Sequence, residues 1–416
     1  MNRSGTQTLD TSLGASETGT KVSSATSALS VALLTAGQDK PYALGMGAAL
    51  AAHGIRVDFI GSDEVDGPEL CSPRVNFLNL RGNQRRDAAY LVKAGRVLRY
   101  YGRLLRYAVS AEPRVFHILW NNYFELFDRV PLMLFYRALG RRVVFTAHNV
   151  NARKRDANDT FLNRLTLKIQ YSLAQHIFVH TEKMKAELMA DFGAAEEKVT
   201  IIPFGINNTL PNTSLTREEA RRHFGLEARH KTLLFFGNIA PYKGLEHLVA
   251  ALGALAKTDP DYRLIIAGAV KNCAEYWKEI EKQVDEQGVR NLLLERIGFI
   301  PDDQAEKYFK AADVLLLPYN HVFQSGVLFL GYSFGVPIIA TDVGSLREDI
   351  LEGKTGFVCR PQDPVDLARS IEVYFASDLF RHLESRRPEI QRFANERYSW
   401  SKVAELTGKV YSSLAA

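Results

Sequence analysis

The chain has 416 residues, of which 46% are hydrophobic and 24% are charged. These values are ordinary for a globular protein and exclude fibrous, collagen-like and wholly disordered classes. No apolar run approaches the roughly 18–20 residues needed to cross a bilayer, and a net charge of +5 is too small to imply a nucleic-acid partner. Three widely separated cysteines (Cys71, Cys273 and Cys359) form neither a disulfide framework nor a zinc motif. They predict a reducing, cytoplasmic setting.

The first 30 residues read as a tail. They hold 13 Ser or Thr and only scattered aliphatic residues, so they cannot bury enough surface to order themselves. The first apolar stretch, residues 30–36, is short for a secretory signal and is better interpreted as a core strand. An organellar transit peptide is the alternative, although such peptides are usually richer in Arg.

From Val31 onward, strand-like and helix-like segments alternate. Short apolar runs recur without polar interruption, which is typical of parallel strands buried on both faces. The first series is Val31–Thr35, Arg56–Ile60, Val115–Trp120, Val143–Thr146, Ile177–His180 and Val199–Ile202. The second series is Leu233–Phe236, Leu264–Ala267, Leu292–Ile297, Val314–Leu317 and Ile338–Ala340. Amphipathic stretches of helix length lie between them, for example Leu245–Ala256, Tyr276–Gln287 and Gln304–Ala311.

This alternation predicts an α/β fold with two Rossmann-like, doubly wound domains that face each other across a cleft. The break between the two series falls in a segment rich in Gly, Asn, Pro, Ser and Thr, at residues 204–222. We therefore expect a first domain at residues 31–205, a linker with its first helix at 206–228, and a second domain at 229–390.

Ligands of open parallel sheets bind beyond the carboxyl ends of the strands, so loops that follow strands are the candidates for chemistry. This rule argues against one acidic pair, Asp259-Pro-Asp261, as a metal site. The pair lies between a predicted helix and the strand that follows it, which is the other edge of the sheet. Turn formation explains Asp-Pro-Asp without a metal.

The loop after Leu233–Phe236 is a candidate phosphate site. It runs from Gly237 to Gly244, contains Lys243 and leads directly into a helix. Glycines let the backbone approach a ligand, a helix N-terminus offers unpaired N–H groups, and lysine supplies a cation. The alternative is a tight turn with a solvated lysine.

A second candidate follows the strand Val314–Leu317. Gln324, Ser325 and Gly326 stand where the next helix, the apolar segment Val327–Phe334, would begin. Their amides and side chains can hold an anion or simply cap that helix.

Five motifs in this half of the chain have a familiar order and spacing. They are Gly237…Lys243-Gly244, Gly298-Phe-Ile-Pro301, Ala312-Asp-Val-Leu-Leu-Leu-Pro318, Gly335-Val-Pro…Gly344…Glu348 and Gly353…Gly356-Phe-Val358. Together they resemble the donor domain of GT-B glycosyltransferases of family 4, closely over residues 228–375 and loosely in the N-terminal half.

The resemblance implies a nucleotide-diphosphate sugar on the second domain, an acceptor on the first, and no metal or other cofactor. It implies that residues 391–416 form a final helix, around Tyr398–Leu414, that crosses back to the first domain. The donor-binding candidates in the matching motifs are Gly237, Asn238, Gly244, Phe299 and Glu348. Gln324, Ser325 and Gly326 are added because they are polar or unhindered and lie at the same edge of the sheet, where we expect them to replace part of the function of family residues that this chain lacks. Charge developing on the leaving diphosphate would be stabilised by Lys243, which we take as catalytic, and by the amides of residues 244, 325 and 326.

The sequence departs from the family pattern at three positions. Members of the family typically carry two glutamates eight positions apart, where this chain has Val322 and Leu330. They also have Arg at the position of Asn238. The nucleotide, the sugar and the retaining or inverting outcome therefore do not follow from the resemblance.

On the first domain, residues 145–149 look like the family's His-Asn loop. The resemblance makes His148 a second catalytic candidate, facing the transferred sugar; the alternative is a hydrogen-bonded core histidine. The acceptor-side candidates are Gly37, Asn121, Asn122 and Asn149, which all follow predicted strands.

Residues Arg81–Arg106 carry eight basic residues against one acid, Asp87, with aromatic and aliphatic residues interleaved. A basic amphipathic helix of this kind is typical of contact with an anionic membrane surface, although a solvated helix that covers the domain is the alternative.

Together these patterns predict a glycosyltransferase of the hexosyl-transferring kind that acts on a glycan or lipid-linked sugar. We expect it to work in exopolysaccharide or glycolipid assembly, peripheral to the inner face of a membrane. The alternatives are a non-catalytic nucleotide-sugar-binding protein and a UDP-sugar epimerase.

Overall fold

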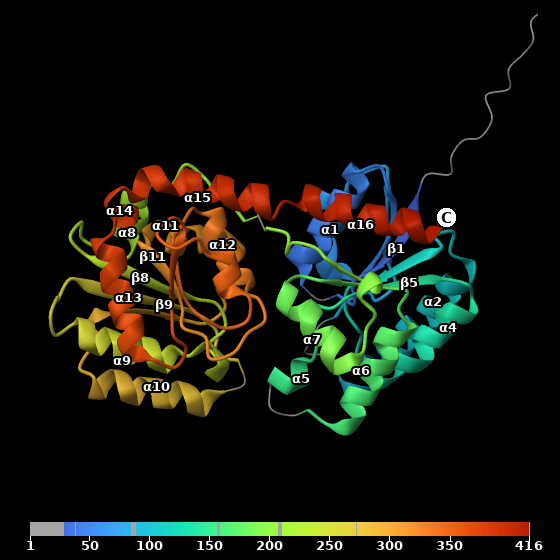
Figure 1. The fold of residues 1–416 in the computed structure, drawn as a ribbon, viewed down its shortest axis with the longest axis horizontal. Coiled ribbons are helices and arrows are strands. Elements are labelled where there is room, and N and C mark those ends of the chain that lie inside the picture. Colours follow the sequence, from blue (N-terminus) through green and yellow to red (C-terminus); the bar gives the residue numbers. More distant parts are fainter. Residues whose placement is uncertain are drawn as a thin grey trace, which may run out of the picture.

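The computed structural model describes residues 29–37, 39–84, 89–155, 159–206, 210–271 and 273–415. Residues 1–28, most of the expected tail, lie outside this description. The described chain forms two α/β units, each built on its own parallel sheet (Figure 1).

The first sheet has seven parallel strands in the order β3-β2-β1-β4-β5-β6-β7. Its strands are β1 Ser30–Leu34, β2 Arg56–Gly61, β3 Val75–Asn79, β4 Val115–Ile118, β5 Arg142–Thr146, β6 His176–Val179 and β7 Val199–Ile201. The order reverses between β1 and β4, which is the switch point at which doubly wound sheets bind ligands.

The second sheet has six parallel strands in the order β10-β9-β8-β11-β12-β13. Its strands are β8 Lys231–Phe236, β9 Tyr262–Gly268, β10 Leu293–Ile297, β11 Val314–Leu317, β12 Ile338–Thr341 and β13 Gly356–Cys359. Here the switch point lies between β8 and β11. The predicted fold class, two Rossmann-like sheets, is confirmed.

Helices connect the strands and cover both sheets (Figure 1). In the first unit they are α1 Lys40–Ala52, α2 Tyr90–Ser110, α3 Glu125–Phe127, the π-helical η3 Asp128–Leu132, α4 Met133–Ala138, α5 Ala152–Arg155, α6 Phe161–Leu173 and α7 Glu182–Phe192. In the second they are α8 Arg217–His223, α9 Leu245–Leu255, α10 Ala274–Glu286, α11 Asp302–Ala311, α12 Gly326–Ser333, α13 Pro364–Ala376 and α14 Asp378–Arg381. The last two are α15 Leu383–Arg397 and α16 Trp400–Ala415. Short 3-10 turns are η1 Asp63–Val65, η2 Pro68–Leu70, η4 Glu196–Lys198, η5 Pro241–Lys243, η6 Arg290–Leu292 and η7 Leu346–Asp349.

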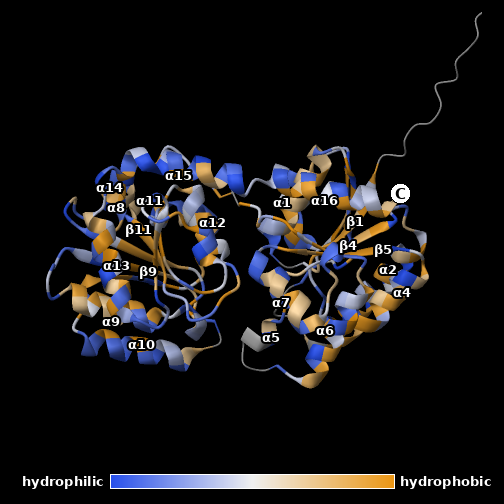
Figure 2. Ribbon diagram, viewed as in Figure 1, coloured by the Kyte–Doolittle hydropathy of each residue, from blue (hydrophilic) through white to orange (hydrophobic). Residues whose placement is uncertain are grey.

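The cores explain why the strand prediction worked. Strands such as β4 and β11 are buried at every position, because helices cover both faces of each sheet (Figure 2). Two strands, β3 and β13, had no prediction. Both lie at sheet edges. β3 is interrupted by two asparagines, and β13 is a four-residue segment that begins with glycine, so neither stands out as a long apolar run.

The chain crosses between the units twice, and the two crossings lie side by side. The backbone N–H of Ile206 donates to the carbonyl of Tyr398 at 2.9 Å. Trp400 fits a notch where a Cβ on Gly45 or Gly205 would come within 2.2 or 2.3 Å of the indole. The second crossing falls between α15, whose Ile390 belongs to the second core, and α16, which packs on the first (Figure 1). The expected division after residue 390 therefore falls inside α15.

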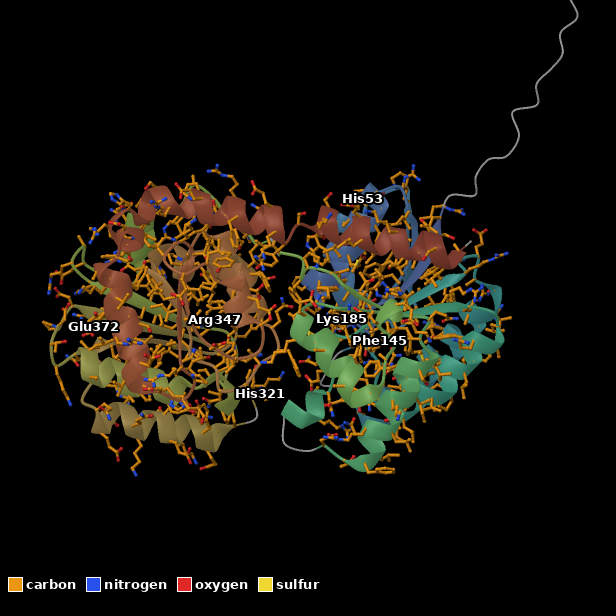
Figure 3. The ribbon with its side chains drawn as sticks, viewed as in Figure 1. His53, Phe145, Lys185, His321, Arg347 and Glu372 are labelled. Atoms are coloured by element: carbon orange, nitrogen blue, oxygen red, sulfur yellow. The ribbon has the colours of Figure 1, made fainter. Side chains whose placement is uncertain are left out.

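The units also touch through the loop after β11. Phe323 belongs to the second unit by sequence, yet it packs with the core of the first. Lys183 of α7 donates to the carbonyl of Gly344 at 3.5 Å. Side chains fill both interiors, and His321 lies on the side of the second unit that faces the first (Figure 3).

The predicted basic helix is shorter than expected. It begins at Tyr90 rather than Arg81, and Arg85 and Arg86 lie outside the described residues. Two residues expected to face a membrane, Tyr101 and Leu104, are 7% and 0% exposed. They point into the core because they share the inner helical face with Tyr100 and Ala108, at a spacing of three and four residues.

Candidate functional site

The loop between β8 and α9 is shaped by two glycines in the left-handed region. Gly237 has φ +95°, and a Cβ there would lie 2.9 Å from Lys243 Nζ. Gly244 has φ +65°, and a Cβ there would lie 2.0 Å from the carbonyl oxygen of Pro318. A side chain at Gly244 would push this loop away from the one after β11, and a side chain at Gly237 would displace Lys243. The two loops therefore approach closely only because residue 244 is glycine.

Lys243 is a buried cation without a counter-ion. It is 5% exposed, and its Nζ donates to the carbonyl of Phe236 at 3.4 Å. Nζ also lies 5.3 Å from the centre of the Tyr319 ring. No carboxylate pairs with it in the part of the chain that the structure describes. Burial lowers the pKa of Lys243 to about 8. An uncompensated buried ammonium favours binding of an anion.

A pocket of about 540 Å³ opens beside Lys243. Of the predicted donor residues and Lys243, those that line it are Gly237, Asn238, Lys243, Phe299, Gln324, Ser325 and Gly326. The structure thus brings together residues from three loops that are separated by up to 89 positions in sequence. Two donor candidates do not line it: Gly244 lies under the loop after β11, and Glu348 is exposed on η7.

The N-terminus of α12 points its polar groups toward this pocket. Ser325 is the N-cap, but its side chain makes no capping bond and instead lies 3.3 Å from the Tyr319 hydroxyl. A Cβ on Gly326 would meet nothing within 4 Å, so the first turn is open. The Oε1 atom of Gln324 is buried and has no hydrogen-bond partner among the described residues. Helix N-termini of this kind are established sites for phosphate.

The remaining walls are apolar or aromatic. Val322 and Leu330, the positions at which the resemblance suggested glutamates, both line the pocket. Phe299 is 82% exposed at its edge, where a flat ligand can stack on it. Among the described residues that line the pocket, Asp39 is the only acid, and it comes from the first unit. The ligand space therefore lies between the two units.

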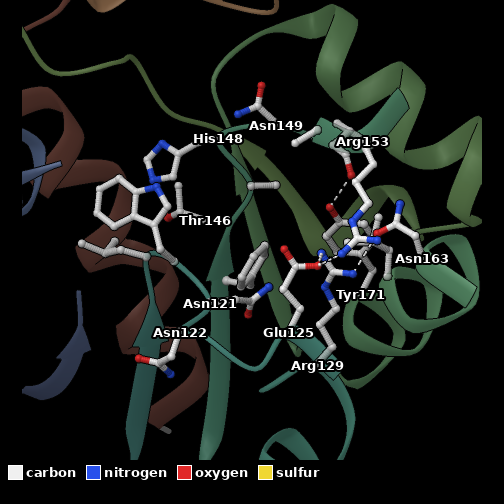
Figure 4. A pocket seen from close by; sticks show the side chains of 17 residues that line it. Asn121, Asn122, Glu125, Arg129, Thr146, His148, Asn149, Arg153, Asn163 and Tyr171 are labelled. Carbon is white, nitrogen blue, oxygen red and sulfur yellow. Dashed lines mark hydrogen bonds and ion pairs between the residues drawn. The ribbon is translucent and has the colours of Figure 1, made fainter. Parts of the chain in front are cut away.

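A second pocket, of about 290 Å³, lies at the carboxyl ends of β4 and β5 in the first unit (Figure 4). His148 and three acceptor-side candidates, Asn121, Asn122 and Asn149, line it. Gly37 does not; it lies near Ser62 and Arg81 at the end of β1.

His148 is held in one tautomer by its neighbours. The carbonyl of Ile202 can only accept, so the hydrogen bond from His180 Nδ1, at 3.2 Å, places the proton on that nitrogen. His180 Nε2 then accepts from His148 Nδ1 at 3.0 Å. This leaves His148 Nε2 with a lone pair, buried and without a partner among the described residues. Burial, together with the nearby His180, holds the pKa of His148 well below its usual value, so the ring is neutral. It stacks on Trp120 at 4.3 Å.

Several lining residues of both pockets escaped prediction. In the pocket beside Lys243 these are Asp39, Tyr242 and Tyr319. In the other pocket they are chiefly Arg129, Arg153, Asn163 and Tyr171, all from helices that follow the strands. The spacing Glu125-x3-Arg129, an ion pair one helical turn apart, was the available sequence signal.

The structure gives three further findings, on metal ligands, on membrane-spanning helices and on the acidic turn. No group of three or more His, Cys, Asp or Glu side chains converges as metal ligands within the described ranges. The expectation that no metal is needed stays a prediction. Over the same residues, no helix has both the length and the apolar content to span a bilayer. The acidic turn Asp259-Pro-Asp261 is occupied by a structural ion pair, because Asp259 bonds Lys231 at 2.6 Å.

Comparison of the sequence with known relatives covers both units. An uncharacterized glycosyltransferase of Methanocaldococcus jannaschii is 29% identical over 244 residues, 58% of this chain and 60% of that protein. A D-inositol 3-phosphate glycosyltransferase of Corynebacterium diphtheriae is 27% identical over 290 residues, 66% of this chain and 65% of its own length. The chain thus spans less than two thirds of these relatives. The corresponding enzyme of Corynebacterium efficiens is 24% identical over 389 residues, 89% of each chain.

Solved structures share the fold. Sucrose-phosphate synthase from Thermosynechococcus elongatus superposes with a TM-score of 0.73 at 21% identity, over 93% of this chain and 99% of that one. HepE of Anabaena, solved with UDP and glucose, gives 0.70 at 17% identity, over 93% and 100%.

Family assignment rests on two matching segments, one in each unit. Residues 41–210 match the family described as Glycosyltransferase Family 4. Residues 230–376 match the family described as Glycosyl transferases group 1. The first unit is therefore a domain of the Glycosyltransferase Family 4 type and the second a domain of the Glycosyl transferases group 1 type, and together they form the GT-B fold of a glycosyltransferase.

Proposed function

We propose that this protein transfers a sugar from a nucleotide-diphosphate sugar to a hydroxyl of a glycan or lipid-linked sugar. The observation that carries the proposal is Lys243, a buried cation without a carboxylate partner, beside the open N-terminus of α12. A diphosphate supplies the negative charge that the ammonium lacks and further oxygens for the N–H groups at the N-terminus of α12. Hydrogen-bond donors and a cation fixed in a buried site stabilise such charge more strongly than water does.

The donor would lie along the 540 Å³ pocket. Its diphosphate would contact Lys243 and the amides of Ser325 and Gly326, and its base would stack near Phe299. Two of the similar structures are of HepE, one with UDP and glucose and one with UDP-glucose. A uridine nucleotide sugar is therefore the first donor to test.

The reaction breaks the bond between the anomeric carbon and the diphosphate oxygen and forms one to the acceptor oxygen. The acceptor hydroxyl loses its proton in this step, and the leaving diphosphate can take it up. Negative charge grows on the leaving diphosphate, next to Lys243. The acceptor would approach from the 290 Å³ pocket of the first unit, with His148 Nε2 as a fixed acceptor for a sugar hydroxyl. The unprotonated nitrogen of a neutral histidine can accept a hydrogen bond from a hydroxyl group, but it cannot donate one.

One observation favours a second function. The apolar side chains of Val322 and Leu330 line the donor-side pocket. A protein that binds nucleotide sugars without reacting with them would need no polar groups there. An epimerase, by contrast, would convert its nucleotide sugar with no acceptor present.

The test is a donor screen with UDP-, GDP-, ADP- and dTDP-sugars on the wild type and on Lys243→Met. Thermal shift measures binding, and release of the nucleoside diphosphate measures the reaction. We expect one nucleotide class to stabilise the wild type and not the variant. Lys278→Met, an exposed lysine on α10, is the control and should behave as the wild type. Binding without release of nucleoside diphosphate would favour the non-catalytic alternative, and no binding by any class would refute the proposal.

The outer face of α2 supports an anionic membrane as the place of action. Arg96, Arg99, Arg103 and Arg106 form one stripe along the helix, at spacings of three and four residues. An adjacent stripe holds Leu91 and Leu98, which are 82% and 69% exposed. The helix contains no acidic residue. Neighbouring basic and apolar stripes match lipid phosphates and the edge of the acyl region. Such a surface fits glycolipid or exopolysaccharide assembly at the cytoplasmic leaflet.

A further inference from the structure

We infer that the pocket of the first unit binds an oxyanion, a phosphate or carboxylate carried by the acceptor, through Arg129 and Arg153. That the ligand is the acceptor of the transfer rests on the proposed function. The anion site rests only on the charges and contacts of the pocket.

Two cations in this pocket share one carboxylate oxygen. Arg129 Nη2 and Arg153 Nη2 each lie 3.0 Å from Glu125 Oε2 (Figure 4). Among the described residues that line the pocket, Glu125 is the only acid. The pocket therefore keeps one formal positive charge in excess.

Arg129 also keeps an unused donor. Its Nη1 donates to Asn163 Oδ1 at 2.9 Å and to Thr166 Oγ1 at 3.2 Å, and its Nη2 is held by Glu125. Its Nε is buried without a partner among the described residues, and the residue is 8% exposed. A buried charged donor left unbonded is costly, so a ligand that bonds it is strongly favoured.

The backbone around Arg129 fixes where its side chain lies. It lies in the π-helical turn η3, which follows α3 and packs against α6, where Asn163 and Thr166 are found. Asn163 is itself held by Asp159 Oδ1 at 2.7 Å and by Asn151 Oδ1 at 3.0 Å. The guanidinium therefore has a fixed position before any ligand arrives, whereas Arg153 is 44% exposed at the side chain and is free to adjust.

These features select the class of ligand. A planar guanidinium presents paired N–H groups that match the oxygens of phosphate and carboxylate. A neutral sugar would gain little from the excess charge. His148 and Asn149, in the same pocket, provide uncharged contacts for hydroxyl groups. An acidic sugar or polyol, such as a sugar phosphate or a uronate, meets both requirements.

The experiment measures anion binding in a Lys243→Met background, so that phosphate cannot be held by the donor-side lysine. Inorganic phosphate, glucose 6-phosphate, glucuronate and glucose are titrated by calorimetry. The Nε–H resonance of Arg129, assigned by its absence in Arg129→Lys, is followed by NMR. We expect phosphate or glucuronate to shift that resonance, with glucose leaving it in place; the tighter of the two probes identifies the oxyanion.

Charge-changing variants then test the site with opposite signs. Arg153→Met should weaken anion binding about tenfold, and Arg129→Met by at least as much. Glu125→Gln, which removes the competing carboxylate, should tighten it about threefold to tenfold, a gain that misfolding cannot produce. Arg137→Met, an exposed arginine on α4 that bonds the carbonyl of Leu173, is the matched control and should bind as the parent does.

Equal anion affinity in Arg153→Met, Glu125→Gln and the parent would overturn the inference, as would an unmoved Arg129 resonance at saturation. Both results are independent of the donor screen. Failure of the screen with a normal anion response would refute the transferase and leave the anion site standing.

Discussion

Each of the two pockets contains a buried cation, but the two cations differ in how many protein groups bond them. Lys243 has no carboxylate partner among the described residues, and its main hydrogen bond is to one carbonyl. Arg129 is tied to Glu125, Asn163 and Thr166 before any ligand binds. Lys243 thus lacks a counter-ion of its own, although Asp39 lines the same pocket, whereas Arg129 is paired with Glu125 and the excess positive charge of its pocket comes from the second arginine, Arg153. A ligand with a full diphosphate should stabilise the first far more than any anion stabilises the second.

Replacing Lys243 should have the largest effect on this difference between the pockets. At pH 7, Lys243→Met should lower transfer by about a hundredfold to a thousandfold, because it removes the charge next to the leaving group. The same change should raise the free energy of unfolding of the ligand-free protein by roughly 1–3 kcal/mol, because a buried uncompensated ammonium is destabilising. Denaturant unfolding with and without nucleotide measures both the gain in stability and the loss of ligand stabilisation.

The effect on stability has a defined pH dependence. The pKa of Lys243 is lowered to about 8 from its ordinary 10.5, so between these values the unfolded chain binds more protons than the folded one. The wild type should therefore become more stable as pH rises from 8 to 10.5, relative to Lys243→Met. The advantage of the variant is complete below pH 8 and vanishes near 10.5. A variant less stable than the wild type at pH 7 would show that another group compensates Lys243.

A smaller effect should sharpen the role of His148. His180→Phe removes the atom that accepts the His148 Nδ1 proton, so the His148 ring can move its proton to Nε2 and lose the lone pair that faces the pocket. Transfer should fall about tenfold to a hundredfold with nucleotide affinity unchanged. His180→Gln, whose amide oxygen can accept that proton, should recover part of the loss.

Nitrogen NMR of the imidazoles separates positioning from packing. The wild type should show His148 protonated at Nδ1, and His180→Phe should show a different tautomer. If transfer falls while the tautomer stays the same, His180 supports only the packing around Tyr42 and Phe204.

The fold was predictable because its information is local. Buried parallel strands such as β4 and β11 are continuous apolar runs, and they appear where the sequence places them. The edge strand β3 was missed because Asn76 and Asn79 interrupt its apolar pattern, and β13 was missed because it has only four residues and begins with a glycine. The inward face of α2 shows the same limit, since a basic helix pattern does not say which aromatic residues pack inside.

The sites divide in the same way. Lys243 and the segment 324–326 lie in loops directly after strands, so their position could be predicted from topology. Arg129 and Arg153 come from helices that converge only when α3, η3 and α5 meet around one pocket. Asp39 reaches the donor-side pocket from the other unit. Residues that meet only in the folded protein have no regular spacing in the sequence, so no sequence pattern predicts such contacts.

The smallest expected effect concerns the outer face of α2. Replacing Arg99, Arg103 or Arg106 singly with Gln should each weaken binding to vesicles with 30% anionic lipid by about fivefold, since one basic residue near such a surface contributes about 1 kcal/mol. Cosedimentation measures the partition, and high salt should remove it in the wild type as well. Lys282→Gln, on the exposed face of α10 in the other unit, should have no effect.

Leu98→Ser should weaken binding even at high salt, because an apolar contact is not screened. If neutral vesicles bind as strongly as anionic ones, the arginine stripe is simply a solvated face of the first unit.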